Sequence, residues 1–472
     1  MAARFELVFI STPAVGNLVP TVEFAQLLIN HDPRFSATIL IIPFPEKPII
    51  NTYVQSRAST ATNLRFLQLP SVDPPPLDQS QSSTGLFSLL AQKHKPHVKD
   101  AILKLTQNES NSDSVRLAGL FVDMFTTAII DVASEIGVPC YLFFASPASF
   151  FGFQLHLASL DSQLAAELLD SGSELVVPSF KNPVPQRVLP PLVLERGNVY
   201  SWLLSHAGRF RETKGVVINT IQELEPHALD SLSHLNLPPV YPIGPVLDFV
   251  GFDPDPAHLK HISEWLDQQP PSSVVFLCFG SMGSLTSAQV KEIAIGLERA
   301  GLRFLWALRE PPKSKLNDPN DFSNLEDVLP IGFLERTAEI GLVCGWVPQV
   351  QILAHKAIGG FVSHCGWNSI LESLWYGVPI ATWPIYAEQH LNAFEMVKEL
   401  GLALVMRLDY RKGDLVCAEE VERVIRNLMD GGDDQIRTKV KEMKEKCRVA
   451  KLENGSSHKN LMTLIEELTA TA

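Results

Sequence analysis

The stretch from Trp346 to Gln389 constrains the fold more than any other part of the chain. Gly360–Ser363 is a short apolar run typical of a buried parallel strand, and a helix is predicted to begin at Trp367. The turn between them reads His364-Cys365-Gly366. A second change from strand to helix is predicted at Tyr386-Ala387-Glu388-Gln389. Two such units in succession predict an open α/β sheet, whose ligands bind beyond the carboxyl ends of its strands.

The first helical turn after His364 predicts a phosphate-binding site. A helix N-terminus presents N–H groups without intrahelical partners and a partial positive charge. Gly366 allows the backbone to approach a ligand closely. Asn368 and Glu372 are four residues apart and therefore share one helix face. One can hold phosphate, while the other accepts hydrogen bonds from a ribose.

Length and composition exclude several other classes of protein. A chain of 472 residues favours at least two domains, and 46% hydrophobic with 19% charged residues is typical of a soluble globular protein. A net charge of −13 argues against binding to nucleic acid or to a membrane surface. The six cysteines form no C-x-x-C pair, so we expect reduced, buried thiols in a cytoplasmic protein and no metal site. Prolines and glycines interrupt the uncharged run Ile136–Leu160, which argues against a stable membrane insertion.

Strands alternate with helices in both halves of the chain, which predicts parallel sheets. In the first half, a loop at Ser11–Pro20 precedes a helix expected from about Thr21 to Asn30, and Phe87–Leu105 is a second predicted helix. The predicted strands are Glu6–Ile10, Ala37–Pro43, Leu64–Leu69, Leu117–Val122, Val138–Phe144, Gly215–Asn219 and Val240–Pro242, and in the second half Val274–Phe279 and Phe304–Leu308. Helices are also predicted at Ser287–Ala300, Ala418–Met429 and Gln435–Cys447.

The whole stretch Trp346–Gln389 resembles the nucleotide-sugar signature of plant family 1 UDP-glycosyltransferases, which modify small secondary metabolites and hormones. The resemblance covers all 44 positions, including the HCGWNS core and the closing Gln, and it extends to the rest of the chain. It implies the GT-B fold, an α/β architecture of two Rossmann-like domains with parallel sheets facing a cleft. The expected parts are an acceptor-binding domain (1–245), a linker (246–260), a UDP-sugar-binding domain (261–455) and a C-terminal helix that packs back on the N-terminal domain (456–472).

The resemblance also implies which residues hold the donor. Trp346 would stack on uracil, Val347 would bond the base through its backbone, and Gln349 would reach the ribose or the base edge. Glu372 would bind the ribose hydroxyls. The residues expected at the phosphates are Ser281, His364, Gly366, Asn368 and Ser369. Those expected at the sugar are Trp367, Tyr386, Glu388 and Gln389, and the closing Gln resembles the members that use UDP-glucose.

The implied reaction is glycosyl transfer with inversion, which needs a base to remove the acceptor proton. In the family this base is a His after the first strand, oriented by an Asp at the end of a later strand. Asp123 matches the Asp, but the sequence reads Gly16-Asn17, so Asn17 occupies the position of the base. An amide has no useful basicity at pH 7. A second departure is Ala145, where many members carry a Thr, and Ser146 is the neighbour that could replace it.

Four explanations of Asn17 stay open. Asn17 is an engineered replacement of a native histidine, or it is natural and holds an acceptor that is already ionised, such as a carboxylic acid or an acidic phenol. Alternatively, another base substitutes, either a water relayed through Asp123 or one of His94 and His97, which would otherwise be exposed helix histidines. In the fourth explanation the protein binds UDP-sugar and acceptor with little turnover.

The sequence thus predicts transfer of glucose from UDP-glucose, without metal or cofactor, to a hydroxyl or carboxyl group of a small hydrophobic plant metabolite. The acceptor pocket is expected among the loop Pro70–Thr84, the Phe87 helix and Phe144–Phe153. A dehydrogenase of the NAD type is the competing enzyme class. The loop Ser11–Asn17 argues against it, because it contains one glycine rather than G-x-G-x-x-G.

Overall fold

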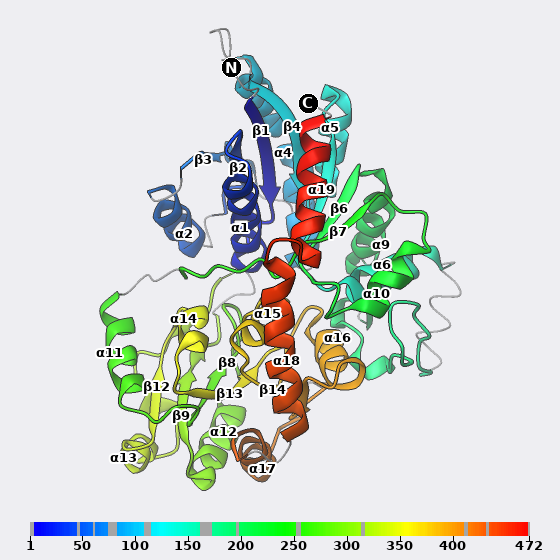
Figure 1. The fold of residues 1–472 in the computed structure, drawn as a ribbon. Helices are drawn as coiled ribbons and strands as arrows, with labels where there is room; N and C mark the ends of the chain where they lie inside the picture. Colours follow the sequence, from blue (N-terminus) through cyan, green and yellow to red (C-terminus); the bar gives the residue numbers. More distant parts are fainter. Residues whose placement is uncertain are drawn as a thin grey trace. The chain divides into compact units, whose positions relative to one another are not determined.

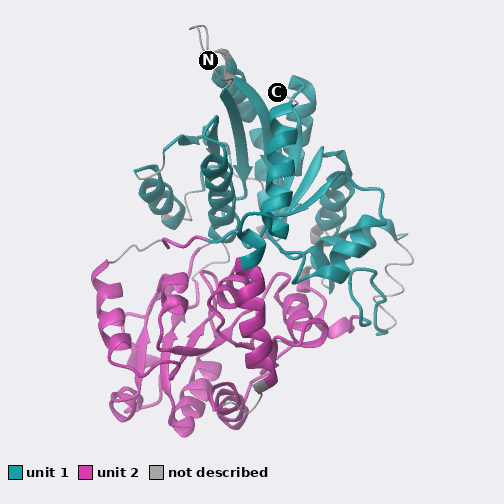
Figure 2. Ribbon diagram, viewed as in Figure 1, with its two compact units in different colours: residues 1–183, 192–247, 449–472 teal, residues 184–191, 248–448 magenta. Residues whose placement is uncertain are grey.

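The computed structural model describes residues 4–44, 48–59, 62–73, 83–107, 115–160, 172–194, 198–251, 256–312, 317–409, 414–430 and 434–470. These divide into two compact units (Figure 2). Unit 1 comprises Met1–Pro183, Leu192–Leu247 and Val449–Ala472, and unit 2 comprises Val184–Pro191 and Asp248–Arg448. Part of the expected linker (252–255) and part of the expected pocket loop (74–82) lie outside the described residues. The functional roles assigned to the two domains stay predictions.

Unit 1 is built on a parallel sheet of seven strands in the order β3-β2-β1-β4-β5-β6-β7 (Figure 1). The order reverses between β1 and β4, so the carboxyl ends of these two strands form a topological switch point, where ligands bind in open α/β sheets. Ser11 ends β1, and Asp123 directly follows β4. The strands are β1 (Arg4–Ser11), β2 (Phe35–Ile41), β3 (Leu64–Gln68), β4 (Val115–Val122), β5 (Cys140–Phe144), β6 (Gly215–Ile218) and β7 (Val240–Pro242).

Helices connect the strands of unit 1, and the C-terminal helix α19 lies against β4 and β7 (Figure 1). Glu467 of α19 accepts hydrogen bonds from Tyr141 Oη (3.2 Å) and from Tyr241 Oη, which ties the end of the chain to the first sheet. The helices are α1 (Val15–His31), α2 (Pro48–Ala58), α4 (Ser83–Gln107), α5 (Ile130–Ile136), α6 (Ala148–Ser159), α8 (Pro191–Leu194), α9 (Asn198–Arg209), α10 (Pro226–Ser233) and α19 (Ser456–Ala470), with short turns η1 (Thr127–Ile129) and η3 (Phe210–Glu212).

The expected start of the first helix was wrong. α1 begins at Val15, about six residues before the predicted Thr21, and it includes Pro20. A proline so close to the N-terminus interrupts little of the hydrogen-bond ladder, so the helix can include it. Asn17 therefore lies in the first turn of a helix rather than in a loop. The second predicted helix is also longer than expected, because α4 extends over Ser83–Gln107 despite Pro96.

Unit 2 repeats the architecture with six parallel strands in the order β12-β9-β8-β13-β14-β15. This order reverses between β8 and β13, which gives unit 2 its own switch point. The strands are β8 (Val274–Cys278), β9 (Arg303–Ala307), β12 (Gly341–Cys344), β13 (Ile358–Ser363), β14 (Ile380–Thr382) and β15 (Ala403–Val405), with an antiparallel pair β10 (Arg309–Glu310) and β11 (Asn320–Asp321). Every residue of β8 and β13 is buried, as their apolar runs predicted.

The helices of unit 2 begin and end close to the predicted positions. Ser287–Ala300 and Ala418–Met429 are confirmed as α12 and α17, which pack against each other (Figure 1). The others are η2 (Gln186–Val188), α11 (Pro256–Asp267), η4 (Leu325–Asp327), α13 (Phe333–Thr337), α14 (Gln349–Ala354), α15 (Trp367–Tyr376), α16 (Gln389–Phe394), the π-helical turn η5 (Glu395–Glu399) and α18 (Asp434–Lys451), whose last residues belong to unit 1.

Candidate active site

His364 lies at the switch point of unit 2, between two glycines. A Cβ atom at Gly280, after β8, would come within 2.5 Å of His364 Nε2, and so would a Cβ atom at Gly366. The imidazole therefore occupies space that only the absence of both side chains provides. Gly280 also has a positive φ of 78°, which favours glycine. Ser281 follows this turn and is half-buried.

Burial lowers the pKa of His364 to about 4, so its imidazole is neutral near pH 7. A neutral ring offers one N–H donor and one acceptor. The ring forms a hydrogen bond with the Cys278 carbonyl, which opposes the effect of burial on the pKa. A phosphate at this position would meet a neutral ring beside the amino end of α15 rather than a full positive charge. The N-terminal residue of that helix is preceded by Gly366, which has no side chain to cap the first N–H groups. The partial positive charge at such a helix start favours an anion.

Buried hydrogen bonds hold the turn before α15 in an uncommon conformation. Cys365 has a φ of 62°, which is rare for a residue with a side chain. Its N–H donates to Ser363 Oγ (3.1 Å), and its carbonyl accepts from Asn392 Nδ2 of α16 (3.0 Å). Asn392 is fully buried. The sequence analysis did not identify Asn392, which supports the turn at Cys365 from a different helix.

Gln349, Ser369 and Glu372 come together as one hydrogen-bonded cluster. Gln349 Nε2 donates to Ser369 Oγ (2.8 Å) and to Glu372 Oε2 (2.7 Å). Burial raises the pKa of Glu372, the bond from Gln349 opposes that shift, and the negative charge of Asp248 adds to it, which together place the pKa at about 7. Glu372 therefore exchanges its proton near neutral pH. Asn368 lies one helical turn before it and is half-buried.

Trp346 is placed by Asp321, a residue that the sequence analysis did not identify. The backbone N–H of Trp346 donates to Asp321 Oδ1 (2.9 Å), and Arg309 Nε lies 2.9 Å from the same oxygen. A Cβ atom at Gly345 would come within 2.2 Å of the Asp321 carboxyl group, so glycine is needed for this approach. The Trp346 side chain is half-buried, whereas Val347 is buried. A flat, partly exposed ring suits stacking on a base.

The second turn, between β14 and α16, is held by Gln389. This side chain is only 2% exposed, and its Oε1 accepts hydrogen bonds from Ile385 N (2.9 Å) and Tyr386 N (3.0 Å). Its carbonyl oxygen thus shapes the loop, and its side chain also forms a hydrogen bond with the Tyr386 hydroxyl. Tyr386 faces His364 with ring centroids 6.3 Å apart. Of the other residues predicted at the sugar, Glu388 is half-buried and Trp367 is buried.

Asp123 lies at the switch point of unit 1, where six hydrogen bonds converge on its carboxylate. Ser11 Oγ (3.1 Å) and Thr12 N (2.6 Å) donate to Oδ2, while Thr12 Oγ1, Phe125 N, Thr126 N and Thr126 Oγ1 donate to Oδ1, each at 3.0 Å. A carboxylate has about four lone-pair positions. Its acceptor capacity is therefore used by the two strand ends that it joins.

Asn17 lies in the first turn of α1, which follows the same strand end. Its carbonyl accepts from Thr21 Oγ1 (2.8 Å), and its side chain is half-buried. Among the hydrogen bonds found in the described residues, none joins the Asn17 side chain to Asp123. The structure thus places the two predicted residues at one switch point but does not pair them.

The expectation that His94 is an exposed helix histidine was wrong. It is fully buried in α4, and its two ring nitrogens lie 2.8 Å from Leu90 O and 3.2 Å from Pro70 O. Both nitrogens are occupied by backbone carbonyls and the side chain is buried, so an acceptor hydroxyl cannot reach either nitrogen. His97 is half-buried on the same helix.

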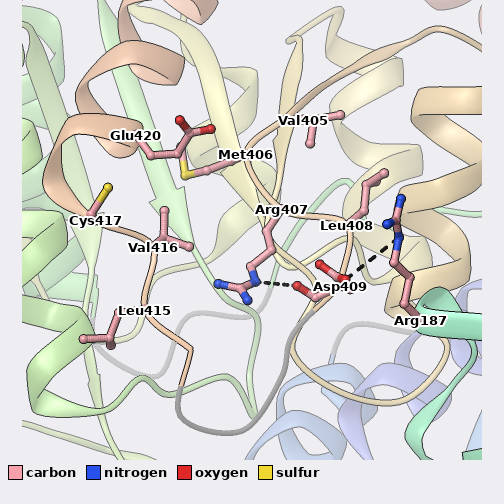
Figure 3. Close-up of a pocket in the computed structure, with 10 residues that line it drawn as sticks. All are labelled: Arg187, Val405, Met406, Arg407, Leu408, Asp409, Leu415, Val416, Cys417 and Glu420. Carbon is pink, nitrogen blue, oxygen red and sulfur yellow. Dashed lines mark hydrogen bonds and ion pairs between the residues drawn. The ribbon is translucent and has the colours of Figure 1, made fainter.

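The cavity in Figure 3 lies elsewhere in unit 2 and contains none of the predicted residues. Its volume is about 520 Å³, and its wall includes Arg407, Asp409 and Arg187 together with the exposed Cys417. Arg407 and Arg187 are both paired with acids, at 3.2 Å from Asp414 and 3.9 Å from Asp409. Among the described residues of this wall, both arginines are thus paired with carboxylates.

The chain was compared with known proteins. A family model described as UDP-glucoronosyl and UDP-glucosyl transferase matches residues 206–430. UDP-glycosyltransferase 43 of Pueraria montana var. lobata is 63% identical, over 99% of this chain and 100% of its own length. The chain belongs to the UDP-glycosyltransferase family. The UDP-glucose flavonoid 3-O-glucosyltransferase 6 of Fragaria ananassa is 47% identical over 99% of both chains. The chain is therefore a glycosyltransferase, as the sequence predicted.

Solved structures of UDP-glycosyltransferases confirm the predicted GT-B fold. The crystal structure of UGT71G1 from Medicago truncatula, complexed with UDP-glucose, matches 99% of this chain and 98% of its own, with a TM-score of 0.88 and 42% identity.

Among the residues described above, no group of three or more His, Cys, Asp or Glu side chains could hold a metal ion. Nor is any described helix long and apolar enough to cross a membrane. All six cysteines fall within the described part of the chain, and each is a free thiol, five of them buried.

Proposed function

We propose that this UDP-glycosyltransferase transfers glucose from UDP-glucose, with inversion, to an acidic hydroxyl or carboxyl group of a small hydrophobic plant metabolite. The donor would lie on the residues of unit 2, with uracil on Trp346, ribose on Glu372, diphosphate at His364 and the start of α15, and the sugar near Gln389. A relative that uses UDP-glucose as its named donor, and a solved relative that binds UDP-glucose, support this choice of donor.

The observation that carries the proposal is the absence of a base at the predicted position. Asn17 cannot accept a proton. The lone pairs of the Asp123 carboxylate already accept hydrogen bonds from other groups, which belong to Ser11, Thr12, Phe125 and Thr126. His94 is buried with both nitrogens against carbonyls. An acceptor that is already ionised needs no base, and the Asn17 amide can donate a hydrogen bond to its oxygen anion.

The reaction is then a single displacement. The acceptor oxygen forms a bond to the anomeric carbon while the bond from that carbon to the UDP oxygen breaks, which inverts the configuration. Negative charge moves from the acceptor to the diphosphate. The partial positive charge at the start of α15, next to the neutral His364 ring, would stabilise that charge where it develops.

A series of phenols of graded acidity tests the proposal. Transfer of glucose, followed by UDP release, should rise with pH in step with the ionisation of each phenol. Asn17→His should accelerate transfer to weakly acidic phenols by about 10²- to 10⁴-fold and change the rate with fully ionised phenols only slightly. Asn17→Ala serves as the matched control, because it supplies neither a base nor a hydrogen bond.

Two outcomes would contradict the proposal. Equal rates with strongly and weakly acidic phenols at pH 7 would mean that another group acts as the base. UDP-glucose binding without transfer to any acceptor would support the alternative that the chain is a base-deficient binder of UDP-sugar and acceptor.

A further inference from the structure

Buried His206 joins two elements of unit 1 next to the Asp123 turn, which we define as Asp123–Thr127. His206 belongs to α9. Its Nδ1 lies 2.7 Å from Thr127 Oγ1 in the Asp123 turn, and its Nε2 lies 2.6 Å from Ser88 Oγ in α4. His206 is 5% exposed, and Ser88 and Thr127 are each 1% exposed. Both ring nitrogens are therefore used inside the protein, in contacts that water does not reach.

The contacts on His206 suit a neutral imidazole. Such a ring has one donor and one acceptor nitrogen, and a hydroxyl can complement either. One of the two hydroxyls thus donates to the ring, while the other accepts from it. Burial lowers the pKa of His206 to about 4, and the nearby Arg209 charge acts in the same direction. The bridge therefore persists without a change of charge across the neutral pH range.

Aromatic side chains fix the orientation of the ring. Trp202, one turn earlier in α9, stacks on His206 with centroids 6.1 Å apart, and Phe125 of the Asp123 turn meets it edge-on at 6.2 Å. Both aromatic residues are half-buried. The imidazole is thus held on its faces as well as at its nitrogens, which leaves it little freedom to move.

The Asp123 turn is consequently anchored at both ends. At one end the Asp123 carboxylate is fixed by Ser11 and Thr12 at the end of β1. At the other end Thr127 is fixed by His206. Between them, Thr126 N and Phe125 N donate hydrogen bonds to Asp123 Oδ1. A displacement of Thr127 would therefore also displace the carboxylate.

We propose that His206 is a positioning residue for glucosyl transfer, which holds the Asp123 turn in place by bridging Thr127 to Ser88. The proposal rests on the proposed function, because that function assigns Asn17 to the acceptor oxygen, and Asp123 fixes Ser11 and Thr12 at the strand end that leads into the helix carrying Asn17. All members of the bridge belong to unit 1, whereas the donor residues belong to unit 2. Loss of the bridge should therefore impair use of the acceptor and leave the affinity for UDP-glucose unchanged.

Three substitutions separate the two contacts of the ring. His206→Phe removes both hydrogen bonds, His206→Asn retains a polar atom near the position of Nδ1, and His206→Gln retains one near Nε2. His156→Asn is the matched control, since His156 is a half-buried histidine of α6 in the same unit. For each variant, kcat, the KM for a phenol acceptor and the KM for UDP-glucose are measured below the melting temperature, from pH 6 to 9.

We expect His206→Phe to lower kcat/KM for the acceptor by about 10- to 100-fold, as small misplacements of reacting groups do. The KM for UDP-glucose should stay within about twofold of the unmodified protein, and the shape of the pH profile should not change. His206→Asn should recover more activity than His206→Gln, because Thr127 belongs to the turn that carries Asp123. His156→Asn should behave like the unmodified protein.

Amide hydrogen exchange at Phe125 and Thr126 gives a readout that does not depend on turnover. His206→Phe should accelerate exchange at both amides. Unchanged exchange would overturn the bridge, and faster exchange with unchanged acceptor kinetics would overturn the positioning role. Failure of the proposed function is seen separately in the unmodified protein, either as equal rates with strongly and weakly acidic phenols or as no transfer to any phenol.

Discussion

Ionisation of Glu372 is expected to control the affinity for UDP-glucose. A carboxylate accepts hydrogen bonds from two ribose hydroxyls, whereas a carboxylic acid has less acceptor capacity. Because burial raises the pKa of Glu372 to about 7, only about a tenth of the unliganded protein carries the anion at pH 6. Binding at that pH must first remove a proton. Affinity should therefore increase about tenfold between pH 6 and pH 8 and then level off.

The assay is isothermal titration with UDP-glucose at pH 6, 7 and 8. UDP itself is unsuitable, because a terminal phosphate ionises near pH 6, whereas both phosphates of UDP-glucose are diesters. Titrations in two buffers of different ionisation enthalpy should show release of about half a proton at pH 7 and almost none at pH 8. Neutral His364, with a pKa of about 4, does not titrate in this range.

Glu372→Gln should abolish the pH dependence, because an amide does not titrate, and should lower the affinity at pH 8. Glu326→Gln is the control: Glu326 is exposed in unit 2 and its loss should leave the dependence intact. Affinity that is constant from pH 6 to 8 in the unmodified protein would refute the reasoning. So would a pH dependence that survives in Glu372→Gln.

The same ionisation should affect folding stability in the absence of ligand. The pKa of Glu372 is about 7 in the folded protein and 4.5 at its ordinary value, so the folded state binds the proton more tightly. Stability is therefore lost as pH rises from about 4.5 to 7, by up to about 3 kcal/mol at 1.36 kcal/mol per pKa unit. Glu372→Gln should be more stable than the unmodified protein at pH 8 in urea unfolding of unit 2, and equal stability would contradict this account.

Three further substitutions test the contacts around the two switch points. Gly366→Ala should weaken UDP-glucose binding at least about tenfold in titration, because its Cβ would lie 2.5 Å from His364 Nε2; unchanged affinity would mean that His364 is not held there. Asn392→Ala should cost about 1–3 kcal/mol in denaturant unfolding, since the buried Cys365 carbonyl loses its donor. Asp123→Asn should lower the melting temperature and cost about 2–3 kcal/mol, because an amide nitrogen would face N–H and O–H donors; a neutral effect would show that the carboxylate does not hold the strand ends.

The residues proposed to bind the donor could be picked out together because they are close in sequence. His364, Gly366, Ser369 and Glu372 belong to one strand–turn–helix unit, whose backbone geometry brings them to one helix end. The supports of this unit could not be predicted in the same way. Asn392 and Asp321 reach it from other elements, and neither carries a local pattern that marks a site.

Asp123 and Asn17 show the limit of prediction from sequence more clearly. The end of the strand at Asp123 and the substitution at Asn17 were visible in the sequence. That Asp123 gives its acceptor capacity to Ser11, Thr12 and Thr126, and none to Asn17, depends on how two strand ends more than a hundred residues apart in the chain meet.

The sequence by itself determined the alternation of strands and helices and the position of the phosphate turn, because periodicity, glycines and helix starts act over a few residues. Only the tertiary structure decided which polar groups are desolvated and which partners they meet. Burial raised the pKa of Glu372, lowered that of His364, and placed His206 between two hydroxyls. These effects depend on the removal of water and on contacts between distant segments, which exist only after the chain has folded.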